Sequence, residues 1–179
     1  AAGLMAAYTA ARRGNSVVLL EKNEKLGKKI YITGKGRCNL TNDCLPDDFL
    51  ANVVHGRKFL TRAAYAFPPA SPMSFFEEQG LALKVERGNR VFPVSDHASD
   101  VTRTLERACR SAGVGICLGE TVREIAVRDG SVCTVRTDKA SYGNRRALVS
   151  LDGIDGGRLF LCGETRAQLR SVQTLACWA

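Results

Sequence analysis

The sequence predicts an α/β protein, and three observations support this prediction. A helical repeat of apolar residues opens the chain, a short β-branched and apolar run follows it, and an acidic residue ends that run. Hydrophobic residues make up 45% of the 179 residues, enough for a packed core and too many for a disordered chain. No apolar run approaches the roughly 18 to 20 residues that would span a bilayer, so we expect no membrane partner.

The first helix, strand and acidic residue follow one another directly. Apolar residues between Leu4 and Ala11 recur at helical spacing, and Gly14 is placed to end the helix. Residues 16–20 form a short β-branched and apolar run, which is typical of a buried strand in a parallel sheet. Glu21 then stands at the carboxyl end of that strand.

Further helices and strands are expected as far as residue 138. They are helices over 55–67, 71–81 and 97–113, two short strands within 81–95 around a turn at 87–89, and three strands within 114–138 with a hairpin turn at 129–130. From about Asn144 the sequence keeps neither the helical nor the strand period.

The opening helix carries half of a dinucleotide-binding fingerprint. Ala1, Ala2 and Gly3 fit the last three positions of G-x-G-x-x-G, and we expect the earlier glycines and the first strand to precede them. Glu21 follows 18 residues after Gly3, where such folds place an acid on the ribose. The alternative is an ordinary βα unit in which Glu21 is a solvated charge.

The stretch "GKGRCNLTN" at 34–42 has no apolar period, so we interpret it as a loop. Gly34 and Gly36 let a backbone approach a ligand without a Cβ in the way. Arg37 offers a planar fork of donors to phosphate or carbonyl oxygens, and Asn39 offers an amide. The alternative is a surface turn with solvated cations.

The longer stretch "EKNEKLGKKIYITGKGRCNLTN" (21–42) resembles the BaiN-like (YhiN) family of NAD(P)/FAD-dependent oxidoreductases. The resemblance continues through "FFEEQGLALKVERGNRVFPVSDHASDV" and "GETVREI", and covers roughly residues 1–137. It implies a Rossmann-like FAD-binding fold of the two-dinucleotide-binding-domain type, truncated here, with a β-meander. It also implies that domains beyond this chain hold the substrate.

The same resemblance implies a set of FAD-binding residues and a reaction. The set is Ala2 and Gly3 for the pyrophosphate, Glu21 and Lys22 for the ribose, Gly36, Arg37, Cys38 and Asn39 along the flavin, and Val122 for the adenine. The reaction is hydride transfer between NADH or NADPH and an unknown small organic substrate through the bound flavin. No residue stands out as a catalytic acid or base.

Two other functions stay open. Flavin disulfide reductases carry a redox pair near this point, and Cys38 with Cys44 would form it, but five residues separate them, one more than in those enzymes. We therefore expect Cys38 to be a packing thiol, with a flavin-facing thiol as the second interpretation. The chain would otherwise be a non-catalytic module that binds FAD or another nucleotide.

Charge and composition limit the partners. The formal charge is +8, but the cations form no single run and aromatic residues do not interleave with them, so we expect no nucleic-acid partner. The seven cysteines include no C-x-x-C pair, which indicates neither a zinc site nor a secreted disulfide framework and favours a cytoplasmic location. His55 and His97 are expected at the surface, and the oligomeric state is open.

The sequence divides at about residue 143. We expect residues 1–143 to form a partial FAD-binding Rossmann-like domain without its first strand, and 144–179 to be an anomalous tail, out of frame or disordered. The family motif Thr-Gly-Ser-Thr-Gly-Asp-Gly is missing, yet "LDGIDGGRLF" at 151–160 can be encoded so that a one-base shift reads Ser-Thr-Gly-Ser-Thr-Gly-Asp-Gly-Tyr. The coding DNA tests this hypothesis.

Overall fold

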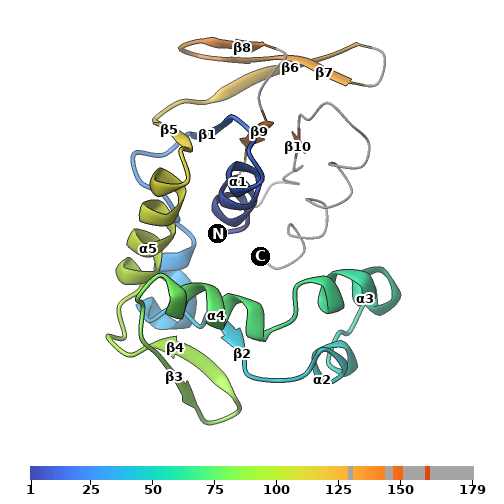
Figure 1. The fold of residues 1–179 in the computed structure, drawn as a ribbon, viewed down its shortest axis with the longest axis vertical. Helices are drawn as coiled ribbons and strands as arrows, with labels where there is room; N and C mark the ends of the chain where they lie inside the picture. Colours follow the sequence, from blue (N-terminus) through green and yellow to red (C-terminus); the bar gives the residue numbers. More distant parts are fainter. Residues whose placement is uncertain (129–130, 144–146, 151–159, 162–179) are drawn as a thin grey trace. The chain divides into compact units, whose positions relative to one another are not determined.

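The computed structural model describes residues 1–128, 131–143, 147–150 and 160–161. The chain divides into two compact units (Figure 1). The first unit comprises residues 1–26 and 106–179, and the second unit comprises residues 27–105. Each unit is described by itself.

The first unit contains a four-stranded sheet in the order β10-β9-β1-β5. Strand β1 (Val17–Glu21) pairs in parallel with β5 (Gly115–Leu118) on one side and with β9 (Ala147–Ser150) on the other. Strand β10 (Phe160–Leu161) pairs antiparallel with β9. Helix α1 (Ala2–Arg12) packs on β1 and β9, and its buried face is made of small residues and Leu4.

An antiparallel meander follows in the same unit, with β6 (Val122–Arg128), β7 (Ser131–Thr137) and β8 (Ser141–Gly143) in that order. It shares a small apolar core with the parallel sheet. Val18 and Leu20 of β1 are buried with Val135 of β7, and Val122 packs against them. The meander is thereby fixed beside the carboxyl end of β1.

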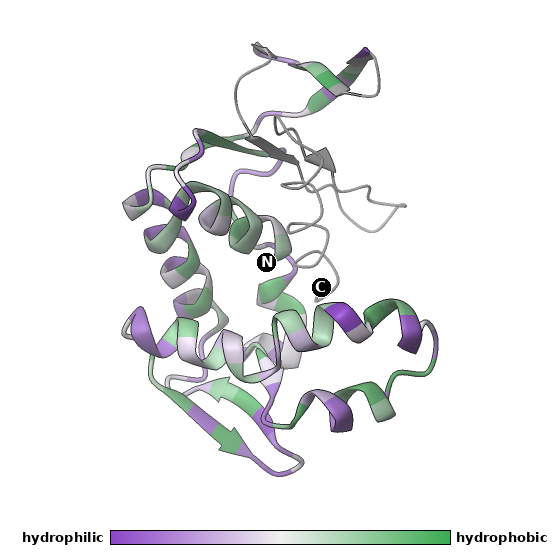
Figure 2. Cartoon of the chain, turned by 45° about the vertical axis from the view of Figure 1, so that its right-hand side comes forward, coloured by the Kyte–Doolittle hydropathy of each residue, from purple (hydrophilic) through white to green (hydrophobic). Residues whose placement is uncertain are grey.

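The second unit is built around a three-stranded antiparallel sheet, β2-β4-β3. Its strands are β2 (Thr41–Asn42), β3 (Leu83–Glu86) and β4 (Arg90–Pro93), and its helices are η1 (Ile30–Gly36), α2 (Pro46–Ala51), α3 (Arg57–Ala66) and α4 (Ala70–Glu78). Hydrophilic and hydrophobic bands alternate along the β3–β4 hairpin, as expected for strands with one covered face (Figure 2). Val91 and Phe92 of β4 are buried.

Helix α5 (Ala98–Ser111) spans the boundary between the two units. Its buried positions, Val101, Leu105 and Ala108 among them, recur at helical spacing. Gly113 follows the helix with a φ of 84°, a conformation that ends helices and suits glycine.

Most of the predicted elements are confirmed. The first helix, the parallel strand β1, helices α3, α4 and α5, the β3–β4 hairpin and strands β5 to β7 all form within a few residues of their predicted bounds. Helix α2 was not predicted, although Pro46 at its first turn, with Asp47 and Asp48, is a recognised start signal. The predicted turn at 129–130 lies outside the described residues.

The predicted division at residue 143 stays a prediction. Of the proposed tail, the structure describes only 147–150 and 160–161, which are strands β9 and β10. Of the helices in the described part of the chain, none combines the length and hydropathy that crossing a bilayer requires.

Candidate functional site

The amino end of α1 is suited to an anion. Gly3 is buried at the first turn, and within the described part of the chain no side chain caps this end and no acidic residue lies in the first turn. The first N–H groups of a helix have no partner inside it, and the helix dipole places partial positive charge there. A pyrophosphate fits this end, and Ala2 and Gly3, predicted to bind it, both lie there.

Glu21 ends β1, and its carboxylate is oriented by the residues that follow. Its Oε1 accepts hydrogen bonds from the backbone N–H of Asn23 at 2.9 Å and from the Asn23 side-chain amide at 2.6 Å. Its carbonyl oxygen accepts from the N–H of Glu120 at 3.0 Å. Lys22 comes directly after it. The predicted ribose acid is thus held at the carboxyl end of a parallel strand, where such folds bind ligands.

Val122 begins the meander close to a buried carboxylate that the sequence did not reveal. Glu120 is only 6% exposed. Its Oε1 accepts from the hydroxyls of Thr137 at 2.6 Å and Tyr142 at 2.7 Å. Because its backbone also bonds to Glu21, Glu120 links the predicted ribose acid to strands β7 and β8 of the meander that Val122 begins. Burial, together with the hydrogen bond to Glu120, raises the pKa of Tyr142.

The "GKGRCNLTN" loop has an unusual backbone. Gly34, Lys35, Gly36 and Cys38 have φ values of 54°, 57°, 85° and 61°, all in the left-handed region. A Cβ on Gly34 would lie 2.9 Å from the backbone nitrogen of Asn39, closer than real contacts. Gly34 is therefore required by both conformation and space.

The end of the loop is joined to strand β4. Leu40 N–H donates to the Val91 carbonyl at 2.9 Å, and Thr41 pairs with Val91 in the β2–β4 ladder. With its amide nitrogen turned toward the carbonyls of Thr41 and Val91, Asn39 donates to them at 3.0 and 3.3 Å. The predicted flavin contact Asn39 is thus also a structural bridge within the second unit.

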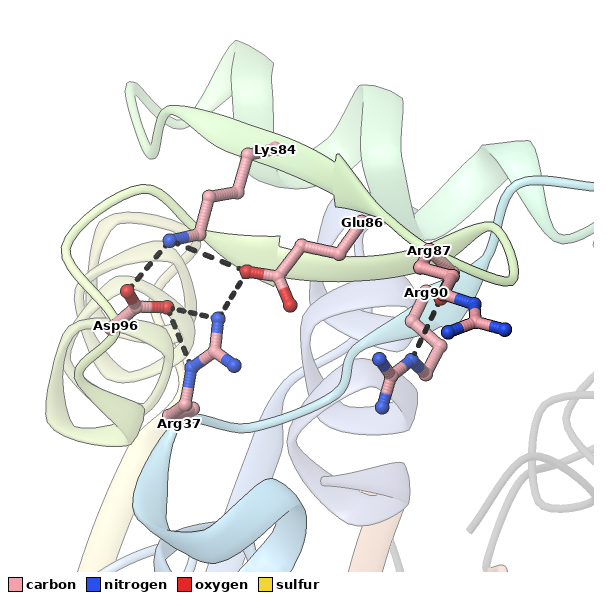
Figure 3. A network of polar contacts seen from close by, with 6 residues as sticks. All are labelled: Arg37, Lys84, Glu86, Arg87, Arg90 and Asp96. Carbon is pink, nitrogen blue, oxygen red and sulfur yellow. Dashed lines mark hydrogen bonds and ion pairs between the residues drawn. The ribbon is translucent and has the colours of Figure 1, made fainter.

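Arg37 lies in a network of charged side chains (Figure 3). Its Nε donates to Asp96 Oδ1 at 2.8 Å, and its Nη2 pairs with Glu86 Oε1 and, at 2.7 Å, with Asp96 Oδ1. Lys84 Nζ lies 2.6 Å from Asp96 Oδ2 and 3.6 Å from Glu86 Oε1. The guanidinium carbon lies 4.2 Å from the centre of the Phe92 ring, a cation–π contact.

These ion pairs favour the charged forms of all the carboxylates in the network. The hydrogen bond from Arg37 lowers the pKa of Glu86, and those from Lys84 and Arg37 lower the pKa of Asp96. The same contacts raise the pKa of Arg37. The network therefore keeps its charges across the neutral range.

Both thiols of the alternative redox pair are in the wrong electrostatic setting for a nucleophile. Cys38 is buried and Cys44 half-buried, and both are free thiols. Burial is the main cause that raises the pKa of each, and Asp48 and Asp43 raise the pKa of Cys44 further. A reactive thiol needs a lowered pKa. The geometry thus favours the packing interpretation of Cys38.

The predicted site residues fall into two groups. The first unit holds Ala2, Gly3, Glu21, Lys22 and Val122, and the second unit holds Gly36, Arg37, Cys38 and Asn39. Among the described residues there is no group of three or more His, Cys, Asp and Glu side chains suited to a metal ion.

Sequence reasoning missed the partners of Arg37. Arg90 lies in the nearby β3–β4 hairpin, but its Nε donates to the carbonyl of Arg87 at 3.0 Å within that hairpin, whereas Glu86 and Asp96 hold Arg37. One signal was available: Lys84 and Glu86 alternate along a strand and so share a face.

Known proteins place this fold in a family. Residues 1–160 match the family described as the HI0933-like protein Rossmann domain. The chain belongs to this family. This confirms the resemblance to BaiN/YhiN-type FAD-dependent oxidoreductases and the Rossmann-like FAD-binding fold.

This chain resembles two curated relatives that are named for different activities. It is 32% identical over 176 residues to the 3-dehydro-bile acid delta(4,6)-reductase of Clostridium scindens, covering 96% of this chain and 42% of the relative. It is 29% identical over 126 residues to the ribosomal RNA dihydrouridine synthase of Haemophilus influenzae, covering 70% of this chain and 30% of the relative. The chain spans less than half the length of both.

Solved structures show the same fold at low identity. The native structure of FqzB superimposes with a TM-score of 0.52 at 19% identity, covering 86% of this chain and 34% of that one. The THI4 of Thermovibrio ammonificans gives a TM-score of 0.51 at 15% identity, covering 76% and 43%. These likenesses concern the fold alone.

Proposed function

We propose that the protein carrying this chain is a FAD-dependent reductase that takes a hydride from NADH or NADPH and adds it to a carbon–carbon double bond of a small organic substrate. The observation that carries the proposal is the pairing of a helix start with a buried glycine, Gly3, and an oriented acid, Glu21, at the end of β1. These two features fit the pyrophosphate and the ribose of FAD.

The names of the relatives support the type of reaction. A delta(4,6)-reductase adds hydrogen to carbon–carbon double bonds, and dihydrouridine is uridine with hydrogen added to its ring double bond. The two substrates share a double bond conjugated to a carbonyl group. A hydride acceptor of this kind suits a reduced flavin, which supplies the hydride-transfer chemistry when bound.

The residues of this chain would bind and orient the cofactor. Glu21 would accept hydrogen bonds from the ribose hydroxyls beside Lys22, and the backbone at Val122 would meet the adenine. Gly36, Arg37, Cys38 and Asn39 would line the flavin half. No side chain of this chain is assigned a proton-transfer role, and we propose that the substrate is held by residues outside it.

The disulfide-reductase alternative is weaker than the reductase proposal. The raised pKa values of Cys38 and Cys44 oppose thiolate formation. The five described cysteines are free thiols, which supports the proposed cytoplasmic location.

A second candidate substrate is RNA, because two relatives of the chain, from Haemophilus influenzae and Escherichia coli, are named ribosomal RNA dihydrouridine synthases. We favour the small molecule, since the relative with the higher identity is the bile-acid reductase.

Spectroscopy of the purified full-length protein tests the proposed function. We expect visible flavin bands, their bleaching by NADPH or NADH without oxygen, and their return on addition of a conjugated enone. A colourless protein that cannot be reconstituted with FAD would overturn the proposal. A flavin that returns only with uridine-containing RNA would replace the small-molecule substrate by RNA.

A further inference from the structure

We propose that Arg37 is a positioning residue of the flavin-side loop: Glu86 and Asp96 hold its guanidinium, and through it they fix the backbone of residues 34–39. The inference rests on the proposed FAD binding and deepens it, because it assigns roles to two carboxylates distant in sequence from the loop. It also changes the role of Arg37 from a direct ligand of FAD to a support for its neighbours.

The charge balance of the network is the first argument. Two cations, Arg37 and Lys84, face two carboxylates, Glu86 and Asp96, so the charges cancel within the group. A phosphate that approached Arg37 would have to compete with two carboxylates already paired with it. A direct phosphate ligand would be expected to have uncompensated charge.

The geometry of the guanidinium is the second argument. Its Nε and Nη2 are both directed at carboxylate oxygens, a forked arrangement that fixes its plane. The Phe92 ring, whose centre lies 4.2 Å from the guanidinium carbon, covers a face of that plane. Arginine held in this way has little freedom to turn toward a second anion.

The backbone supplies the third argument. Arg37 lies between Gly36 and Cys38, both with positive φ, and a non-glycine residue in this region needs support from its surroundings. The N–H groups of Arg37 and Cys38 donate to the carbonyls of Gly34 and Thr33 at 3.2 Å. Anchoring the Arg37 side chain to β3 and to the turn before α5 therefore holds this backbone from outside the loop.

Arg87 lies in the β3–β4 hairpin directly after Glu86 and provides a matched control. Figure 3 shows Arg87 and Arg90 apart from the Arg37 network, although all three are arginines of the second unit. Arg87→Gln removes one positive charge from the second unit, as Arg37→Gln does, without removing any of the contacts described for Arg37.

The test is a double-mutant cycle on FAD affinity in the full-length protein, with FAD titrated into the apoprotein. The variants are Arg37→Gln, the pair Glu86→Gln with Asp96→Asn, all three together, and Arg87→Gln as control. Asparagine at 96 is chosen because it tolerates the φ of 57° there. If the variant with Glu86→Gln and Asp96→Asn does not fold, the single variant Asp96→Asn takes its place.

If the inference holds, Arg37→Gln and the carboxylate variant each weaken FAD binding by about three- to tenfold, and the triple variant is no weaker than Arg37→Gln. Arg37→Gln and the carboxylate variant also change the visible bands of bound FAD, and both speed hydrogen exchange at the amides of Arg37, Cys38 and Leu40. Arg87→Gln changes neither, and the amides of β1 keep their protection in every variant.

Unchanged or tighter FAD binding in the carboxylate variant, with Arg37→Gln still weakening it there, would show that Arg37 contacts FAD directly and would overturn the inference. Failure of the proposed function is a different result. In that case the wild-type protein itself takes up no FAD, and both conclusions fall.

Discussion

At the scale of single residues, Gly34 shows how the loop depends on one missing side chain. Its φ of 54° belongs to the left-handed region, and a Cβ would lie 2.9 Å from Asn39 N and 3.2 Å from Phe92 Cε1. Neither neighbour is free to move away, because Asn39 N belongs to the backbone and the Phe92 side chain is buried. Gly34 therefore has a steric role, because the absence of a Cβ leaves room for Asn39 and Phe92.

We predict that Gly34→Ala destabilises the second unit by about 1–3 kcal/mol more than Gly88→Ala does. Gly88 has a φ of 77°, and no atom lies within 4 Å of the position that a Cβ would take, so alanine there carries only the backbone penalty. Hydrogen exchange at Arg37 and Cys38, with thermal unfolding of the full-length protein, measures the difference. Equal effects of the two variants would mean that the loop relaxes around the new methyl group.

The thiols give a second prediction at this scale. Burial raises the pKa of Cys38, so we expect it to react with iodoacetamide at neutral pH more slowly than an exposed thiol of a short peptide, and to speed up only at alkaline pH. Mass spectrometry of the labelled peptides gives the rate. Rapid labelling of Cys38 at neutral pH would restore the flavin-facing or redox interpretation.

At the scale of elements, Glu120 fastens the meander to the parallel sheet. Its carboxylate accepts from Thr137 and Tyr142, which lie 17 and 22 residues further along the chain. Its N–H donates to the end of β1 at Glu21. One residue therefore joins three strands of the first unit.

Replacing Glu120 by alanine is expected to lower the free energy of unfolding by about 1–3 kcal/mol, because two half-buried hydroxyls lose their hydrogen bonds to a buried carboxylate. Glu124→Ala is the matched control: that side chain is 54% exposed and pairs with Arg136 across the same meander. We expect it to cost about 0.5 kcal/mol or less. Similar losses in chemical denaturation of the two variants would contradict the assigned role.

The buried thiol of Cys109 joins helix α5 to α1, and its ionisation makes the stability of the fold depend on pH. Cys109 Sγ donates to the Leu4 carbonyl at 3.3 Å, and burial raises its pKa from the usual 9.0 to about 11. The folded state then keeps a proton that the unfolded state has lost, so stability is intact below pH 9 and falls as the pH rises toward 11. The loss is up to about 1.4 kcal/mol per pH unit.

This linkage is measured by unfolding at about pH 8 and about pH 10 in the wild type and in Cys109→Ala. We expect the wild type to lose more stability between these pH values than the variant does, since other groups titrate alike in both. Parallel losses would mean that Cys109 ionises in the folded protein as it does in the unfolded one.

At the scale of the whole molecule, the sequence predicted local features and missed distant ones. The apolar run at 16–20 predicted a buried parallel strand, because a strand covered on both faces leaves that mark in the sequence. The partners of Arg37 lie 49 and 59 residues away and meet it only after the second unit has folded. Glu120 looked like any polar residue, since burial of a carboxylate depends on donors from other strands.

The net charge of +8 leads to a prediction for the full-length protein. We expect weak RNA binding that fades between about 50 mM and about 200 mM salt, because only scattered phosphate contacts would contribute. Fluorescence anisotropy with a uridine-containing RNA measures it. Tight binding that persists at the higher salt would favour RNA as the substrate.

The position of β1 in its sheet has a kinetic consequence. Its residues, 17–21, hydrogen-bond to 115–118 on one side and to 147–150 on the other, so both pairings close loops of about a hundred residues or more. Contacts so remote in sequence make folding slow. During synthesis on the ribosome β1 is made well before β5 and β9. The strands β3 and β4, in contrast, follow each other closely in sequence and can pair at once. Until residues 115–118 and 147–150 have been made, β1 lacks these two partners, and we expect chaperones to bind its apolar residues.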